Sequence, residues 1–123
     1  MKFQSFNIES KNGKSNCVIR SICKVLDKEY DEVYNDLINI AKEYNLSFND
    51  ILVFEKYLNK NKFMKHDEYK NLMIKDLNLD GKNIIFCYDK KDTYHMVALI
   101  DNTLYDKSNF SLELYVISVY KKF

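Results

Sequence analysis

The sequence predicts an α+β domain in which N-terminal helices pack on a C-terminal antiparallel sheet. Apolar residues recur at helical spacing between residues 17 and 60. After Gly81 the pattern changes to short runs of β-branched and aromatic residues, which are typical of strands. Helices followed by strands favour an antiparallel sheet over alternating βαβ units. We expect one domain, residues 1–123, because a chain of this length buries enough surface to fold without disulfides or metals.

The first helix is expected directly after a polar loop, residues 7–16, that contains Gly13. Ser15 or Asn16 is suited to cap this helix, and either cap places Cys17 in the first helical turn. The expected buried face consists of five aliphatic residues: Val18, Ile19, Ile22, Val25 and Leu26.

Two more helices are expected over residues 30–44 and 49–60, and Asp31 and Glu32 suit the positive N-terminal end of the first of these. Their expected buried faces are Val33, Leu37, Ile40, Ala41 and Tyr44 in one, and Ile51, Leu52, Phe54, Tyr57 and Leu58 in the other. Residues 63–80 show no clear pattern, apart from a short helix near 73–77.

Four strands are expected, over residues 83–88, 94–100, 103–106 and 112–120. The second and third form a hairpin, because Asp101-Asn102 is a plausible two-residue turn between apolar runs. If Ile100 pairs with Thr103, then His95 and Asp106 share one face on a diagonal of roughly 7–8 Å, which their side chains can close.

Composition and charge exclude several classes of function. The 19 basic and 18 acidic residues nearly cancel and the lysines are scattered, so no positive patch for nucleic acid is expected. The longest apolar runs are too short to cross a bilayer, and the N-terminus lacks the apolar segment of a signal peptide. We therefore expect a cytoplasmic protein. The cysteines lack the paired spacing of a disulfide framework or a zinc site, and we expect neither a metal nor another cofactor.

One cysteine is placed for chemistry. Cys17 lies at a helix N-terminus, which lowers a thiol pKa, whereas Cys23 and Cys87 lie among apolar residues and are expected to be buried. His95 opens an apolar strand, a rigid element suited to orient a base, while His66 lies in a polar segment. An acid that accepts the second ring proton of His95 would complete a triad, and Asp106 is in position to do so.

These residues resemble a known family, the papain-like cysteine peptidase superfamily, and more closely its small phage and bacterial members. The resemblance is carried by four segments: NCVIRSI at 16–22, DEVYNDL at 31–37, HMVALI at 95–100 and LYD at 104–106. Together they span most of the chain. The resemblance implies a single papain-like domain with Cys17 as nucleophile, His95 as general base and acid, and Asp106 as the orienting residue.

The oxyanion hole departs from the family pattern. Papain-like enzymes usually carry a glutamine about six residues before the cysteine, where this chain has Lys11. Asn12 or Asn16 is the expected substitute, together with the Cys17 backbone N–H. Arg20, one turn after Cys17, is expected to pair with a carboxylate in a structural role.

The resemblance implies a thiol hydrolase that forms a thioester with a protein or peptide substrate. Peptide cleavage, deamidation and transamidation share that intermediate, and the sequence does not separate them. The alternative is an inactive papain-like fold that serves as a phage or bacterial interaction or anti-defence factor, within the bacterial host cell if the chain is phage-encoded.

Overall fold

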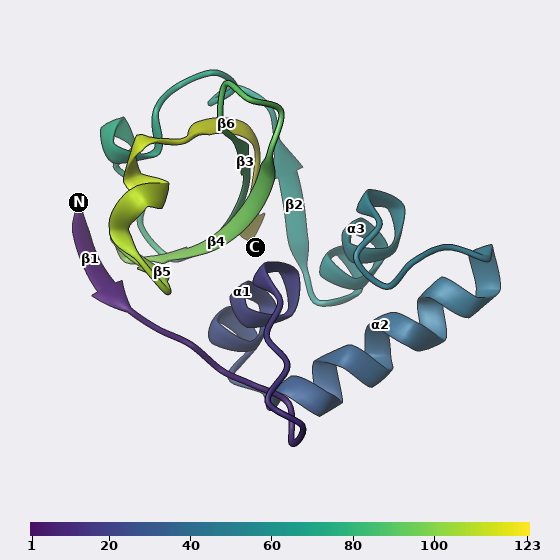
Figure 1. Cartoon of the computed structure of the whole chain (residues 1–123). Helices are drawn as coiled ribbons and strands as arrows, with labels where there is room; N and C mark the ends of the chain where they lie inside the picture. The colour runs from purple at the N-terminus through teal and green to yellow at the C-terminus, as the bar shows by residue number, and fades with distance from the viewer.

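Three helices pack against a mixed six-stranded sheet in the computed structural model, which describes residues 1–123 (Figure 1). The helices are α1 (Cys17–Leu26), α2 (Tyr30–Tyr44) and α3 (Ile51–Lys60). The strands are β1 (Lys2–Ser5), β2 (Phe63–His66), β3 (Lys82–Tyr88), β4 (Tyr94–Ile100), β5 (Thr103–Asp106) and β6 (Tyr115–Lys122). Two short 3₁₀ helices are η1 (Ile74–Asp76) and η2 (Asn109–Glu113).

The sheet has the strand order β1-β5-β4-β3-β6-β2, and all neighbours are antiparallel except β1 and β5. The C-terminal strands β3 to β6 are antiparallel, as expected, but the whole sheet is mixed because β1 joins it in parallel. Two edge strands, β1 and β2, were not expected, and β1 precedes the helices and runs parallel to β5. Each has only four residues, too few for apolar alternation to stand out in the sequence.

Helix α1 begins at Cys17, as expected, and Asn16 is its cap. The Asn16 Oδ1 accepts hydrogen bonds from the backbone N–H groups of Val18 at 2.9 Å and Ile19 at 3.3 Å. At its other end, Asp27 takes the left-handed conformation with φ 57° and closes the helix. Helix α1 lies against β4, whereas α2 contacts α1 and α3 and lies farther from the sheet (Figure 1).

Three apolar residues expected to be buried are instead exposed. Tyr44 is 41% exposed, Ile51 47% and Leu52 42%. Helix α3 begins at Ile51 with Asp50 as its cap, so Ile51 and Leu52 occupy the first turn. The face of α3 that packs in the core is instead formed by Val53, Phe54, Tyr57 and Leu58.

The central strands match the expected ranges closely. Strands β4 and β5 have the expected bounds, and β3 begins one residue earlier than expected, at Lys82. Strand β6 begins at Tyr115 rather than at residue 112, because the preceding residues form η2. The short helix expected near 73–77 is η1.

The hairpin between β4 and β5 has the register that the sequence predicts. Ile100 pairs with Thr103, and Ala98 pairs with Tyr105. Asp101 and Asn102 form the turn, with φ values of 47° and 62°, as a type I′ turn requires at both central positions. This register places His95 and Asp106 on the same face of the sheet.

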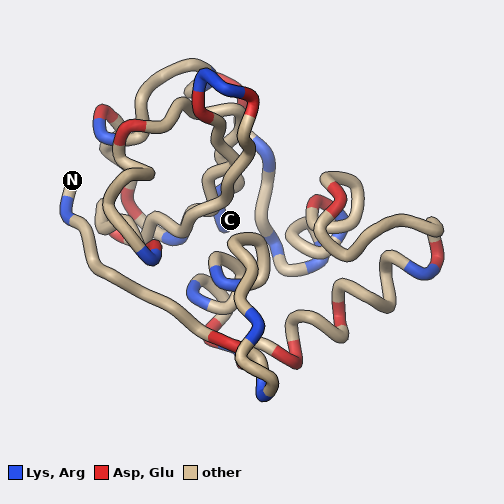
Figure 2. The backbone as a smooth tube through the Cα atoms, in the orientation of Figure 1, with Lys and Arg blue, Asp and Glu red and all other residues tan.

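Each face of the sheet covers a separate core. The first core lies between the helices and the sheet, and Ile84 and Met96 contribute to it from β3 and β4. The second core lies on the opposite face, where Ile85 and Val97 pack with residues of η1 and the loops around it. None of the helices has the length and apolar character that crossing a bilayer requires. Lys and Arg, like Asp and Glu, are scattered along the backbone in short separate segments (Figure 2).

The hairpin turn offers a test of the register. Asn102 combines a left-handed backbone with a buried side-chain oxygen that has no hydrogen-bond partner. Asn102→Gly removes the backbone strain and the unpaired oxygen, but glycine loses more conformational entropy on folding. We expect a net rise of about 1 kcal/mol in the free energy of unfolding, measured by urea titration. Asn45→Gly, at another left-handed position, is the control, with an expected change within about 0.5 kcal/mol. A loss of stability in Asn102→Gly would contradict the turn geometry.

Candidate active site

Cys17 and His95 line the same surface hollow, which we call the Cys17 hollow. It has a volume of about 290 Å³ and lies between the start of α1, the start of α3 and strands β3 and β4. The residues that line it are Cys17, Val18, Asn49, Asp50, Ile51, Phe54, Phe86, Tyr94, His95 and Met96. The structure therefore brings the helix N-terminus and the strand histidine to one accessible place.

His95 is oriented by Asp106. The Nε2 of His95 lies 2.8 Å from Oδ2 of Asp106, and the two side chains are 16% and 1% exposed. With Nε2 donating to the carboxylate, Nδ1 is the ring nitrogen left for the Cys17 thiol. The structure thus brings together all three residues of the triad expected from the sequence.

Asp106 is held in turn by Arg20. The guanidinium Nη2 donates to Asp106 Oδ1 at 3.0 Å, and the backbone N–H of Lys107 donates to the same oxygen at 2.8 Å. Arg20 is only 6% exposed, so this is a buried ion pair. Its Nη1 also donates to Ser15 Oγ at 3.2 Å, which connects Asp106 to the loop before Cys17. The expected carboxylate partner of Arg20 is therefore the orienting acid itself.

Two further side chains hold the site. The hydroxyl of Ser21 lies 2.7 Å from the Cys17 carbonyl oxygen and 2.9 Å from that of Met96, and so bridges α1 and β4. The ring of Phe110, in η2, packs on the His95 ring with a centroid distance of 5.4 Å. Nothing in the linear sequence pairs Phe110 with His95, because η2 meets β4 only through the tertiary fold.

The environment favours the Cys17 thiolate. Burial by itself raises the thiol pKa, but the hydrogen bond and positive charge of His95, the Met96 backbone N–H and the Arg20 charge lower it. The net result is a pKa below the ordinary value for cysteine. Burial instead raises the pKa of Cys23 to about 12 and also raises that of Cys87, so these two buried thiols stay protonated, as expected of packing residues.

The same network favours the imidazolium form of His95. Burial lowers its pKa, but the hydrogen bonds and negative charges of Asp106 and Cys17 outweigh burial and raise the pKa to about 9. Burial raises the pKa of Asp106, but the hydrogen bond and charge of His95 and the Lys107 N–H lower it below its usual range. The interactions therefore favour the charged form of each group in turn, a thiolate, an imidazolium, a carboxylate and a guanidinium, which alternate in sign.

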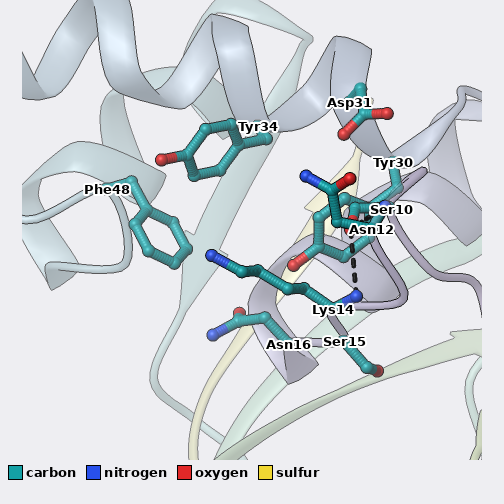
Figure 3. A pocket seen from close by; sticks show the side chains of 9 residues that line it. All are labelled: Ser10, Asn12, Lys14, Ser15, Asn16, Tyr30, Asp31, Tyr34 and Phe48. Carbon is teal, nitrogen blue, oxygen red and sulfur yellow. Dashed lines mark hydrogen bonds between the residues drawn. The ribbon is translucent and has the colours of Figure 1, made fainter.

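A second, larger hollow lies beside the first, and we call it the Lys14 hollow (Figure 3). It has a volume of about 410 Å³. Its lining residues are Ser10, Asn12, Lys14, Ser15, Asn16, Tyr30, Asp31, Tyr34 and Phe48. Both expected oxyanion residues, Asn12 and Asn16, line this hollow, and Cys17 does not.

Asn16 is the better placed of the two for an oxyanion hole. It precedes Cys17, and its Oδ1 is fixed by two backbone N–H groups, while Nδ2 donates to no group of the chain. The Cys17 N–H, the first of the helix, likewise has no intrahelical acceptor. Lys11, at the usual glutamine position, uses its backbone N–H to bind Asp31 at 3.3 Å.

His66, the other histidine, is not part of this site. It ends β2 and pairs with Glu68, with Nδ1 3.0 Å from the carboxylate. The three cysteines are all free thiols. No group of three or more His, Cys, Asp or Glu side chains is arranged to hold a metal ion.

No family model, curated protein or solved structure matches the chain. Function is therefore inferred from the side chains of the site. Arg20 lies away from the apolar face of α1, so helical spacing does not indicate that it is buried, and in the sequence it is distinguished only by its place one turn after Cys17. Its burial requires a carboxylate partner, but the sequence does not say which one.

The buried ion pair predicts a large loss of stability on substitution. Arg20→Met leaves the Asp106 carboxylate buried without its partner, and we expect the free energy of unfolding to fall by about 3 kcal/mol or more. Lys75→Met is the matched control, because its ion pair with Glu113 is exposed and should contribute less than about 1 kcal/mol. Equal, small losses in the two variants would show that Arg20 does not hold Asp106.

Proposed function

We propose that the chain is a papain-like thiol hydrolase that acts on amide carbonyls through a thioester on Cys17. One observation carries this proposal: a half-buried histidine, bonded to a buried carboxylate at 2.8 Å, lines the same hollow as a thiol at a helix N-terminus. Cysteine nucleophiles are activated by this combination of a helix N-terminus and a neighbouring imidazolium.

The arrangement of the elements supports a papain-like architecture. The proposed nucleophile begins α1, which packs on β4, while the base and the orienting acid belong to β4 and β5. The catalytic groups therefore come from a helix and from the sheet it packs against. Membership of the papain-like superfamily is part of the proposal and rests on this arrangement and on the sequence resemblance.

The chemistry follows from the position of each group. The Cys17 thiolate attacks the amide carbonyl carbon, and the oxyanion that forms is stabilised by the Cys17 N–H and Nδ2 of Asn16. His95 then gives its Nδ1 proton to the leaving nitrogen as the C–N bond breaks, which leaves a thioester. Water attacks the thioester while His95 takes up its proton, and the acid product and free Cys17 result.

The identity of the substrate amide decides the product. A backbone amide gives peptide cleavage, and a glutamine side chain gives deamidation with release of ammonia. An amine in place of water gives transamidation. All three reactions use the same residues, and the partner in each is a protein or peptide.

Alkylation kinetics test the activated thiol. We expect iodoacetamide to label Cys17 at pH 6 much faster than an ordinary thiol, of which fewer than about one in three hundred molecules is ionised at that pH. His95→Ala removes the cation that lowers the Cys17 pKa, so the rate at pH 6 should fall on the order of tenfold or more. Mass spectrometry of the labelled peptides gives the rate at each cysteine.

The pH dependence of the alkylation rate tests whether His95 places a positive charge beside Cys17. The imidazolium persists through neutral pH and is lost as the pH rises through about 9. Because this cation lowers the pKa of Cys17, wild-type alkylation below that pH should depend on pH less steeply than alkylation of His95→Ala. In His95→Ala the rate should rise about tenfold per pH unit below the thiol pKa. Cys23 and Cys87 are the internal controls. Equal, slow labelling of all three thiols would favour the inactive, protein-binding alternative.

Trapping of the acyl-enzyme tests the reaction itself. The chain is incubated with a bacterial lysate and quenched in acid, and adducts on Cys17 are sought by mass spectrometry. We expect an adduct that hydroxylamine releases, as it does thioesters, and that is absent in Cys17→Ala and retained in Cys23→Ala. An adduct that persists in Cys17→Ala, or no adduct together with an unreactive Cys17, would contradict the proposal.

A further inference from the structure

We propose that the Lys14 hollow binds an acidic side chain of the substrate, on the acyl side of the amide that Cys17 attacks. This inference rests on the proposed function and adds a substrate class to it.

The two hollows flank the start of α1 and share their borders. Asn16 lines the Lys14 hollow, and the next residue, Cys17, lines the Cys17 hollow. On the other side, Phe48 lines the first and Asn49 the second. At both borders, one residue lines one hollow and its neighbour in the chain lines the other. An extended substrate peptide that passes over the Cys17 sulfur therefore reaches into both hollows.

His95 sets the direction of the substrate. It lines only the Cys17 hollow, and the group that protonates the leaving nitrogen must lie beside it. The leaving part of the substrate therefore extends into the Cys17 hollow, whose lining is mainly apolar. The acyl part extends the other way, past Asn16 and into the Lys14 hollow.

Lys14 is an unpaired cation in this hollow. It forms no ion pair with any carboxylate of the chain. Its side chain extends across the hollow, and the ammonium group lies between the side chains of Asn16 and Phe48 (Figure 3). The residues that follow these two in the chain, Cys17 and Asn49, line the Cys17 hollow. A substrate carboxylate that enters beside Asn16 therefore meets this ammonium group first.

The other lining groups fit a carboxylate as well. Asp31, the only acid of the lining, lies away from the Lys14 ammonium group and accepts the Lys11 backbone N–H at 3.3 Å (Figure 3). The hydroxyl of Tyr34, which lines the hollow, donates to no group of the chain and is available to a ligand (Figure 3). A basic side chain at the same place would face a like charge.

Peptide electrophiles test the subsite directly. The probes are short peptides that end in a vinyl sulfone and carry Glu, Gln or Lys at one of the two residues before it. The Cys17 thiolate adds to the vinyl group, the adjacent carbon takes a proton, and no group leaves. We expect a Glu probe to label Cys17 about fivefold faster than the Gln probe, the factor expected of one exposed ion pair, and a Lys probe to be slowest.

Charge reversal at two lysines of one loop separates the subsite from general electrostatics. Lys14→Glu should invert the order, so that the Lys probe becomes the fastest, and Lys14→Met should abolish the preference. Lys11→Glu changes the net charge equally but does not alter the lining of the hollow, so the Glu preference should remain. High salt should weaken the wild-type preference, as it does for exposed ion pairs.

The outcomes distinguish failure of the acidic subsite from failure of the proposed thiol hydrolase function. Equal rates for the three probes, with Cys17 still labelled rapidly by iodoacetamide, would overturn the acidic subsite and leave the thiol hydrolase standing. A Glu preference that survives Lys14→Glu would also overturn it. If neither the probes nor iodoacetamide label Cys17 faster than Cys23, the proposed function fails and the subsite fails with it.

Discussion

The structure of the site depends on a single buried carboxylate. Asp106 is almost fully inaccessible to solvent, and a charge in that position is tolerated only if hydrogen-bond donors surround it. Its donors are His95 from β4, Arg20 from α1 and the backbone N–H of Lys107 after β5. One carboxylate therefore holds together the helix that begins with the thiol and the strand that carries the histidine.

Alternation of charge explains how ionised groups persist in a partly buried site. Arg20 balances Asp106, and His95 lies between the carboxylate and the Cys17 thiol, whose ionised form its positive charge favours. Desolvation disfavours each charged form, but the neighbours of opposite sign outweigh it. An isolated cysteine with the same burial would have a raised pKa, as Cys23 does. The reactivity proposed for Cys17 is thus a property of the group of four residues.

The sequence predicted the local features well, because each is determined by a few neighbouring residues. The Asn16 cap, the start of α1 and the β4–β5 register all follow from residues within one helical turn or one hairpin. That register was sufficient to place Asp106 beside His95. The expected ranges of β4 and β5 were correct for the same reason.

Features that depend on distant contacts escaped prediction. The parallel pairing of β1 with β5, the exposure of Ile51 and Leu52 and the packing of Phe110 on His95 arise only in the complete fold. Arg20 and Asp106 are 86 residues apart, and the apolar face of α1 does not indicate which carboxylate Arg20 meets.

The large separation in sequence between the two ends of this ion pair also determines the order in which the residues of the site are synthesised. As the ribosome makes the chain from its N-terminus, Cys17 emerges long before His95 and Asp106, so its thiol stays unactivated until the last third of the chain has been synthesised and folded.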